Sequence, residues 1–162
     1  MKSPEITQVL KRKTPVLELI RENLQDKQAR FSMIITRGGN AAFILNSYLS
    51  EFVGNRIFMT GSNFEGDRDR KDYNFRVLSN IIQCMESGNQ LTMQNLEQIY
   101  GSLYELFNQN FMVVGKKKNC RIALENMNNP MCYVNDDFHC MILLDERKIP
   151  FSDPPFLNRF EK

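Results

Sequence analysis

The residues best placed for phosphate chemistry lie in the short segment Thr36-Arg37-Gly38-Gly39-Asn40. Glycines allow backbone N–H groups to turn inward around a phosphate, and an adjacent arginine neutralises its charge. A P-loop, G-x-x-x-x-G-K-[ST], also supplies a lysine, and this segment has neither the full loop length nor the lysine. We therefore expect a strand-to-helix turn here, with weak phosphate contact through Arg37, Gly38, Gly39 and Asn40 as the alternative.

One carboxylate is a candidate for the acid of a hydrolytic site. Glu97 follows the predicted strand 90–95, where a Walker B strand would place the acids that hold magnesium and orient water. Gln94 and Asn95 end this strand, so Glu97 is the only acid of the segment. It also suits the first turn of the following helix, where a negative charge is stabilised. We expect this helix-start role, with a general base or magnesium-linked acid as the alternative.

The thiols and the single histidine do not follow a metal-binding pattern. Cys84, Cys120, Cys132 and Cys140 include no C-x-x-C pair. His139 and Cys140 are adjacent on a predicted strand, so their side chains point to opposite faces. We expect buried, inert thiols and no metal site. The N-terminus carries no apolar signal sequence, so the expected location is cytoplasmic.

Three consecutive lysines, Lys116 to Lys118, stand between two short apolar runs at 111–114 and 121–124. This order predicts a β-hairpin with Gly115 to Asn119 at its tip. Like charges at such a tip are usually solvated and discourage strand pairing. Contact with an acidic protein or RNA is the alternative.

Arg159 follows a Pro-Pro pair and stands between the apolar residues Leu157 and Phe160. A guanidinium held by buried neighbours at a domain edge can reach a phosphate on an adjacent subunit, as an arginine finger does. A surface ion pair with Asp153 or Glu161 is the alternative.

Composition limits the class of protein. The chain has 162 residues, of which 42% are hydrophobic and 25% charged, as in a single globular domain. Its net charge of +2 is too small to drive binding to a phosphate backbone, so nucleic acid is not an expected partner. The longest apolar runs are similar in length to 141–144. They fall far short of the roughly 18 residues of a membrane span, so no transmembrane segment is expected.

Strands and helices are expected to alternate along most of the chain. Short apolar runs indicate strands, and apolar residues spaced three and four apart indicate helices. The expected strands are 31–35, 56–60, 90–95 and 138–144, and the main expected helices are 41–52, 73–87 and 96–111. Two Ser/Thr-Pro pairs, at 3–4 and 14–15, predict helix starts in the lead-in. The alternation predicts an α/β fold of three layers, with a mainly parallel sheet between helices.

Several blocks of the sequence are similar to the AAA+ region of the mysterin-type family of giant ATPases and E3 ubiquitin ligases. The most specific blocks are 94–109 and 155–162, the latter reading Pro-Phe-Leu-Asn-Arg-Phe-Glu-Lys. Stretches at 31–49, 84–88 and 137–138 also resemble this family. The likeness, which covers about 29–162, implies a dynein-like AAA+ module, one of six along a polypeptide in which only some retain ATPase residues.

In the frame of this family, Arg159 matches the arginine-finger position, which acts in trans, and Asp145 lies at the sensor 1 position. The segment Arg37 to Asn40 takes the place of the P-loop, and Glu97 lies in the Walker B region. The chain departs from the pattern in lacking the Walker lysine and in having Gln94-Asn95 where acids are usual. Asp145 also stands where a polar sensor such as Asn is usual. These departures imply a degenerate module that does not hydrolyse ATP.

The resemblance also implies a domain plan and partners. A helical lead-in, 1–28, precedes an AAA+-like module, 29–162, that includes an inserted β-hairpin and stops before the last strand and the lid. No cofactor is expected in this chain, whereas ATP and magnesium belong to neighbouring modules and zinc to the ligase domains of a parent protein. The expected partners are adjacent AAA+ modules and, through the parent, the ubiquitin machinery. The expected function is a structural and coupling unit in an ATPase ring, with a small independent nucleotide-binding or nucleotide-hydrolysing enzyme as the alternative.

Overall fold

A parallel sheet forms the centre of the molecule. The computed structural model describes residues 15–68, 70–124 and 129–161, and the helix start expected at 3–4 lies outside them. The sheet contains β1 (Ser32–Thr36), β2 (Arg56–Thr60), β3 (Gln90–Gln94) and β7 (His139–Asp145), in the order β1-β7-β3-β2. All three neighbouring pairs are parallel. The expected α/β class and mainly parallel sheet are therefore confirmed.

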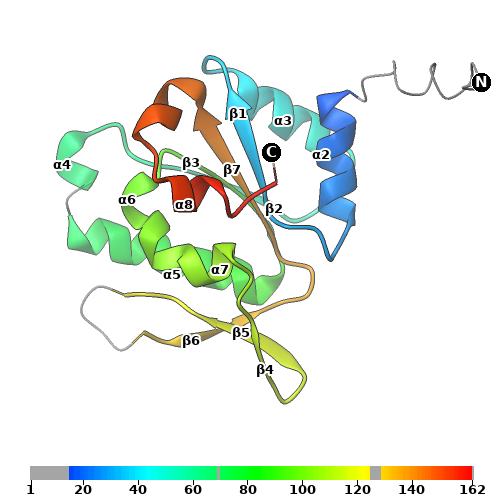
Figure 1. Ribbon diagram of the computed structural model, residues 1–162, viewed down its shortest axis with the longest axis vertical. Helices are drawn as coiled ribbons and strands as arrows, with labels where there is room; N and C mark the ends of the chain where they lie inside the picture. Colours follow the sequence, from blue (N-terminus) through cyan, green and yellow to red (C-terminus); the bar gives the residue numbers. More distant parts are fainter. Residues whose placement is uncertain (1–14, 69, 125–128, 162) are drawn as a thin grey trace, which may run out of the picture.

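Helices cover both faces of this sheet (Figure 1). On one face lie α2 (Val16–Gln25) and α3 (Ala41–Leu49), and on the other lie α5 (Lys71–Ser87), α6 (Glu97–Tyr100), η1 (Gly101–Leu103) and α7 (Tyr104–Phe107). The central strand β7 contributes to both cores because successive side chains of a strand point to opposite faces. Met141 and Leu143 pack beneath α2 and α3, whereas Ile142 and Leu144 pack beneath the other layer.

A second, smaller sheet projects from the end of the body (Figure 1). It consists of β4 (Met112–Val114), β5 (Lys117–Arg121) and β6 (Met131–Val134), all antiparallel, in the order β4-β5-β6. The hairpin is present, but its expected register and five-residue tip are wrong. Gly115 and Lys116 both have positive φ, +57° and +69°, as a two-residue type I′ turn requires, so Lys117 and Lys118 already belong to β5.

The helix expected over 96–111 is also shorter and less regular than its spacing predicts. It is divided into α6, η1 and α7, and it ends at Phe107. The 3-10 segment begins at Gly101, whose conformational freedom makes an α-helix less stable. The apolar spacing was nevertheless informative, because Ile99, Leu103 and Phe107 are all buried in the core.

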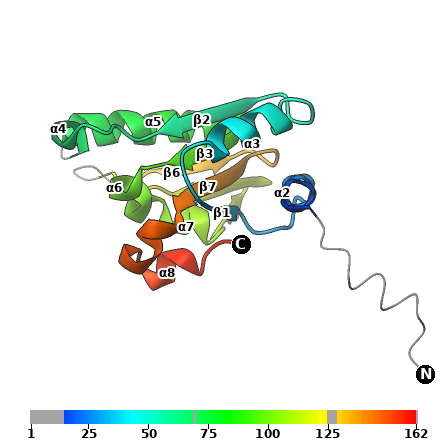
Figure 2. The ribbon, with the colours of Figure 1, turned by 90° about the horizontal axis from the view of Figure 1, so that it is seen from above.

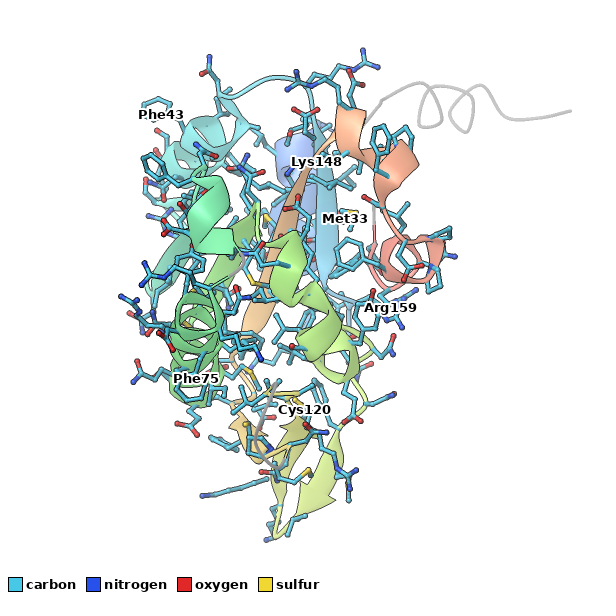
Figure 3. The ribbon with its side chains drawn as sticks, turned by 90° about the vertical axis from the view of Figure 1, so that its left-hand side faces the viewer. Met33, Phe43, Phe75, Cys120, Lys148 and Arg159 are labelled. Carbon is cyan, nitrogen blue, oxygen red and sulfur yellow. The ribbon has the colours of Figure 1, made fainter. Side chains whose placement is uncertain are left out.

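Two aromatic side chains of the helices α3 and α5 are exposed. Phe75, in the first half of α5, lies about a quarter-turn away from the face that buries Leu78, Ile81 and Met85. Phe43 lies on the outer side of α3, whereas Leu45 and Leu49 of the same helix are buried. Figure 3 shows both rings on the same side of the molecule.

The C-terminal segment packs against the main body and reaches β1. It contains η2 (Glu146–Phe151) and α8 (Pro154–Leu157). A further short helix, α4 (Glu65–Arg68), lies in the loop between β2 and α5. Beyond α8, the Glu161 N–H donates to the Phe31 carbonyl (2.9 Å) and the Met33 N–H donates to the Glu161 carbonyl (2.7 Å). These bonds form a single parallel bridge at the outer edge of β1. Over the described residues, no helix has the length and apolar character to cross a membrane.

Candidate functional site

The carboxyl ends of β1, β7 and β3 bring most of the predicted site residues to one edge of the sheet. Thr36 of β1 is in register with Asp145 of β7, and Gln94 of β3 is in register with Leu143. Because the strands are parallel, the segments that follow them emerge on the same side. In open α/β sheets this edge is the usual place of ligands.

The turn at the end of β1 has the predicted position, between strand and helix. Gly38 has a φ of +82°, which favours glycine, and Asn40 is the N-cap residue of α3 without a side-chain capping bond. Arg37, the residue named for phosphate contact in the alternative interpretation of this turn, pairs through Nε with Glu146 Oε2 at 2.6 Å. This ion pair is exposed to solvent, so its contribution to stability is small.

Asp145 is also engaged within the chain. It is the N-cap residue of η2, and its Oδ1 accepts from the backbone N–H of Arg147 at 2.9 Å. The Arg147 guanidinium adds two contacts, Nε to Oδ1 at 2.9 Å and Nη2 to Oδ2 at 2.7 Å. These bonds from Arg147 lower the pKa of Asp145 to about 2. The carboxylate therefore stays ionised and is held by its own segment.

Lys148 is the residue of this edge that the sequence analysis missed. Its Nζ donates to Asn95 Oδ1 at 2.9 Å and to Glu97 Oε1 at 2.5 Å, joining η2 to the segment after β3. A lysine ammonium thus occupies the oxygen donors that a divalent cation would use at the end of this strand. The signal in the sequence was the Glu-Arg-Lys run directly after an apolar strand.

Gly61 fixes the place of Asn95 at this edge. The Gly61 N–H donates to the Gln94 carbonyl at 2.8 Å, and a Cβ at residue 61 would overlap the carbonyl oxygen of Asn95. Asn95 itself has a φ of +57°. The backbones of the two loops are therefore in contact, and only glycine fits at position 61.

We expect Gly61→Ala to lower the free energy of unfolding by about 1–3 kcal/mol, the usual cost of overpacking. The added methyl group must push the Asn95 backbone away, because backbone atoms cannot rotate aside as a side chain can. Urea denaturation of the purified chain measures the change. Gly39→Ala is the matched control, since a Cβ there meets nothing within 4 Å. Equal stability of the two variants would contradict the close approach.

Arg159 does not join the other predicted residues. Figure 3 shows it beside α8, away from Lys148 and the carboxyl edge. Its guanidinium carbon lies 4.0 Å from the centre of the Tyr104 ring, a cation–π contact, and the Tyr104 hydroxyl lies 3.1 Å from Asp153 Oδ2. Within the described part of the chain, Arg159 forms no ion pair, and its Nε and Nη1 have no hydrogen-bond partner. The alternative of an ion pair with Asp153 or Glu161 is therefore wrong for the described residues.

The four thiols are buried, as expected. Burial raises the pKa of all four, that of Cys120 to about 12, so they remain protonated at neutral pH. Cys140 packs in the larger core, and the ring of the adjacent His139 lies edge-on to that of Phe31, with the ring centres 5.3 Å apart. The predicted divergence of these two side chains stays a prediction, because Phe31 contacts His139 and also belongs to the core that contains Cys140.

The parallel sheet, its helical layers and the inserted antiparallel sheet define a partial AAA-type subdomain. A sequence model described as the RNF213 AAA domain matches residues 21–162. The chain belongs to this family, which confirms the resemblance seen in the sequence.

Three curated relatives illustrate the likeness. The E3 ubiquitin-protein ligase rnf213-beta of Danio rerio is 28% identical over 156 residues, which cover 90% of this chain. The E3 ubiquitin-protein ligase RNF213 of Mus musculus is 27% identical over 165 residues and 94% of the chain, and that of Homo sapiens is 26% identical over 140 residues and 85% of the chain. The chain spans about 3% of the length of each of these relatives.

Proposed function

We propose that this chain is a non-hydrolysing AAA module that acts as a structural and coupling unit in the ATPase ring of an RNF213-type E3 ubiquitin ligase. The observation that carries the proposal is the contact of Lys148 with Asn95 and Glu97. In a hydrolysing module the acid after this strand holds magnesium or orients water. Here a cation that belongs to the chain itself neutralises that acid.

The donors at this edge do not fit magnesium-bound ATP. Glu97 is paired with Lys148, Arg37 with Glu146, and Asp145 with Arg147. The turn after β1 supplies no lysine for the β- and γ-phosphates. We therefore assign no hydrolytic step to this chain, and we place ATP and magnesium at neighbouring modules and zinc in ligase domains elsewhere in a longer protein.

Coupling to a neighbouring module is assigned to Arg159. The Tyr104 ring, whose hydroxyl is bonded to the Asp153 carboxylate, packs against the guanidinium. Arg159 is only partly buried and has no ion-pair partner among the described residues, which supports a role for its charge in binding an anion. In this proposal, Arg159 contacts a phosphate bound by the adjacent AAA module. The same proposal places the protein in the cytoplasm, with the ubiquitin machinery as a partner of the whole ligase.

The test of coupling is Arg159→Ala in the longer protein that contains this module. Loss of one charge-assisted contact to a transition-state phosphate is expected to lower ATP turnover at the neighbouring module by about 10³-fold or more. Arg147→Ala is a matched control, because that arginine is exposed and contacts only its own segment. ATP turnover unchanged by Arg159→Ala would contradict the assignment.

A further inference from the structure

β4 is an edge strand whose outer side has no neighbour among the described residues. Its partner is β5 alone, with Val114 opposite Lys117 and Val113 opposite Lys118. In a hairpin with a two-residue turn, the residues that flank the turn exchange hydrogen bonds, and the next pair does not. The N–H and the carbonyl of Val113 therefore point away from β5, toward the open edge.

This edge carries none of the usual features that prevent pairing with another strand. Proteins protect their edges with charges, prolines or bulges on the edge strand. β4 consists of Met112, Val113 and Val114, whose side chains are 54%, 69% and 61% exposed. In contrast, the outer edge of β1 already has a bridge to Glu161. The hairpin also projects from the body, so its edge is sterically open (Figure 1).

The charge beside this edge is positive. Lys117 and Arg121 lie on the same face of the sheet as Met112 and Val114, because the paired residues of adjacent strands share a face. Lys118 is paired with Asp136 at 2.9 Å, but within the described residues Lys116, Lys117 and Arg121 form no ion pair. An apolar edge and unpaired cations are thus presented together.

We propose that the β4 edge binds an extended acidic polypeptide segment, which adds to the small sheet as a fourth strand beside Val113. Main-chain bonds to Val113 set the alignment, apolar side chains cover Met112 and Val114, and carboxylates approach the cations of β5. A polypeptide is favoured over RNA because the open edge offers strand hydrogen bonds, and the net charge is only +2. The surface is separate from the carboxyl edge, so this inference stands or fails independently of the proposed function.

The test is fluorescence anisotropy of the 162-residue chain with a labelled peptide of about eight alternating Glu and Val residues. We expect binding that weakens about tenfold when salt is raised from about 50 mM to about 300 mM, because surface charges are screened. The charge reversals Lys117→Glu and Arg121→Glu together are expected to weaken binding by about tenfold or more. Arg76→Glu on α5 is the control for a reversal at another exposed arginine.

The strand geometry is tested at Val113. Val113→Pro removes the N–H that points to the open edge and leaves the bonds between β4 and β5 in place, so binding is expected to be lost while the chain stays folded. Val113→Thr keeps the N–H and is expected to bind. Equal binding of a peptide N-methylated at alternate residues would show a purely electrostatic contact and overturn the proposal. Absence of peptide binding would also overturn the proposal. Tighter binding of an oligouridine probe, abolished by the Lys117→Glu and Arg121→Glu reversals, would overturn it as well.

Discussion

Replacing Phe156 by alanine is expected to lower the free energy of unfolding by about 3–5 kcal/mol, the usual cost of removing a buried aromatic ring. Phe156 is only 4% exposed, and its ring centre lies 5.0 Å from that of Tyr100 and 5.3 Å from that of Phe160. The stacked and edge-on contacts add to the burial of its surface. A helix as short as α8 has no stability of its own, so these contacts hold it in place.

Urea denaturation of the purified chain measures this loss, and Phe151→Ala is the control. Phe151 belongs to the neighbouring η2 segment and is 90% exposed, so its replacement is expected to change stability by less than about 0.5 kcal/mol. Similar losses in the two variants would contradict the packing described for α8. Because Arg159 follows α8, Phe156→Ala is also expected to release Arg159 from Tyr104.

Acid is expected to destabilise the chain through His139. Its imidazole is buried, both ring nitrogens have no partner in the described part of the chain, and burial lowers its pKa from 6.5 to about 4. Between these values the unfolded chain binds a proton that the folded chain does not. Stability therefore falls as the pH decreases through this window, by about 3 kcal/mol at pH 4 for a shift of this size.

Unfolding free energies measured in urea at several pH values from about 7 to about 4 test this account. The control is His139→Leu, which cannot titrate at this position but retains every other ionisable group. We expect the slope of stability against pH to be smaller in the variant by the amount assigned to His139. Parallel curves for the two proteins would show that His139 does not contribute.

The parallel sheet was predictable because its signals are local. Apolar runs such as Met33-Ile34-Ile35 are separated by helices of clear periodicity, and few other arrangements bury such strands on both faces. The breaks in the helix after β3 were not predictable, and neither was the third strand of the small sheet. Gly101 permits a break without requiring one, and β6 has only four residues, which is too short for a periodic pattern.

The candidate site was predictable only in its position. The chain order places Arg37, Glu97 and Asp145 at or just after the carboxyl ends of parallel strands, so their shared edge follows from the topology. Their partners do not follow, because Lys148 meets Glu97 across 51 positions of sequence and Arg37 meets Glu146 across 109. Only the folded structure shows that the available charges neutralise one another.

The most direct test of the non-hydrolysing module is ATP turnover by the purified 162-residue chain with magnesium, alongside the Glu97→Gln and Lys148→Met variants. We expect no turnover above buffer in any of the three, because the turn after β1 contains no phosphate-binding lysine and Glu97, the acid that follows β3, is paired with Lys148 in the unmodified chain. Calorimetry with ATP and ADP on the same samples separates static binding from hydrolysis. Turnover by the unmodified chain that Glu97→Gln abolishes would contradict the account and identify a nucleotide-hydrolysing enzyme.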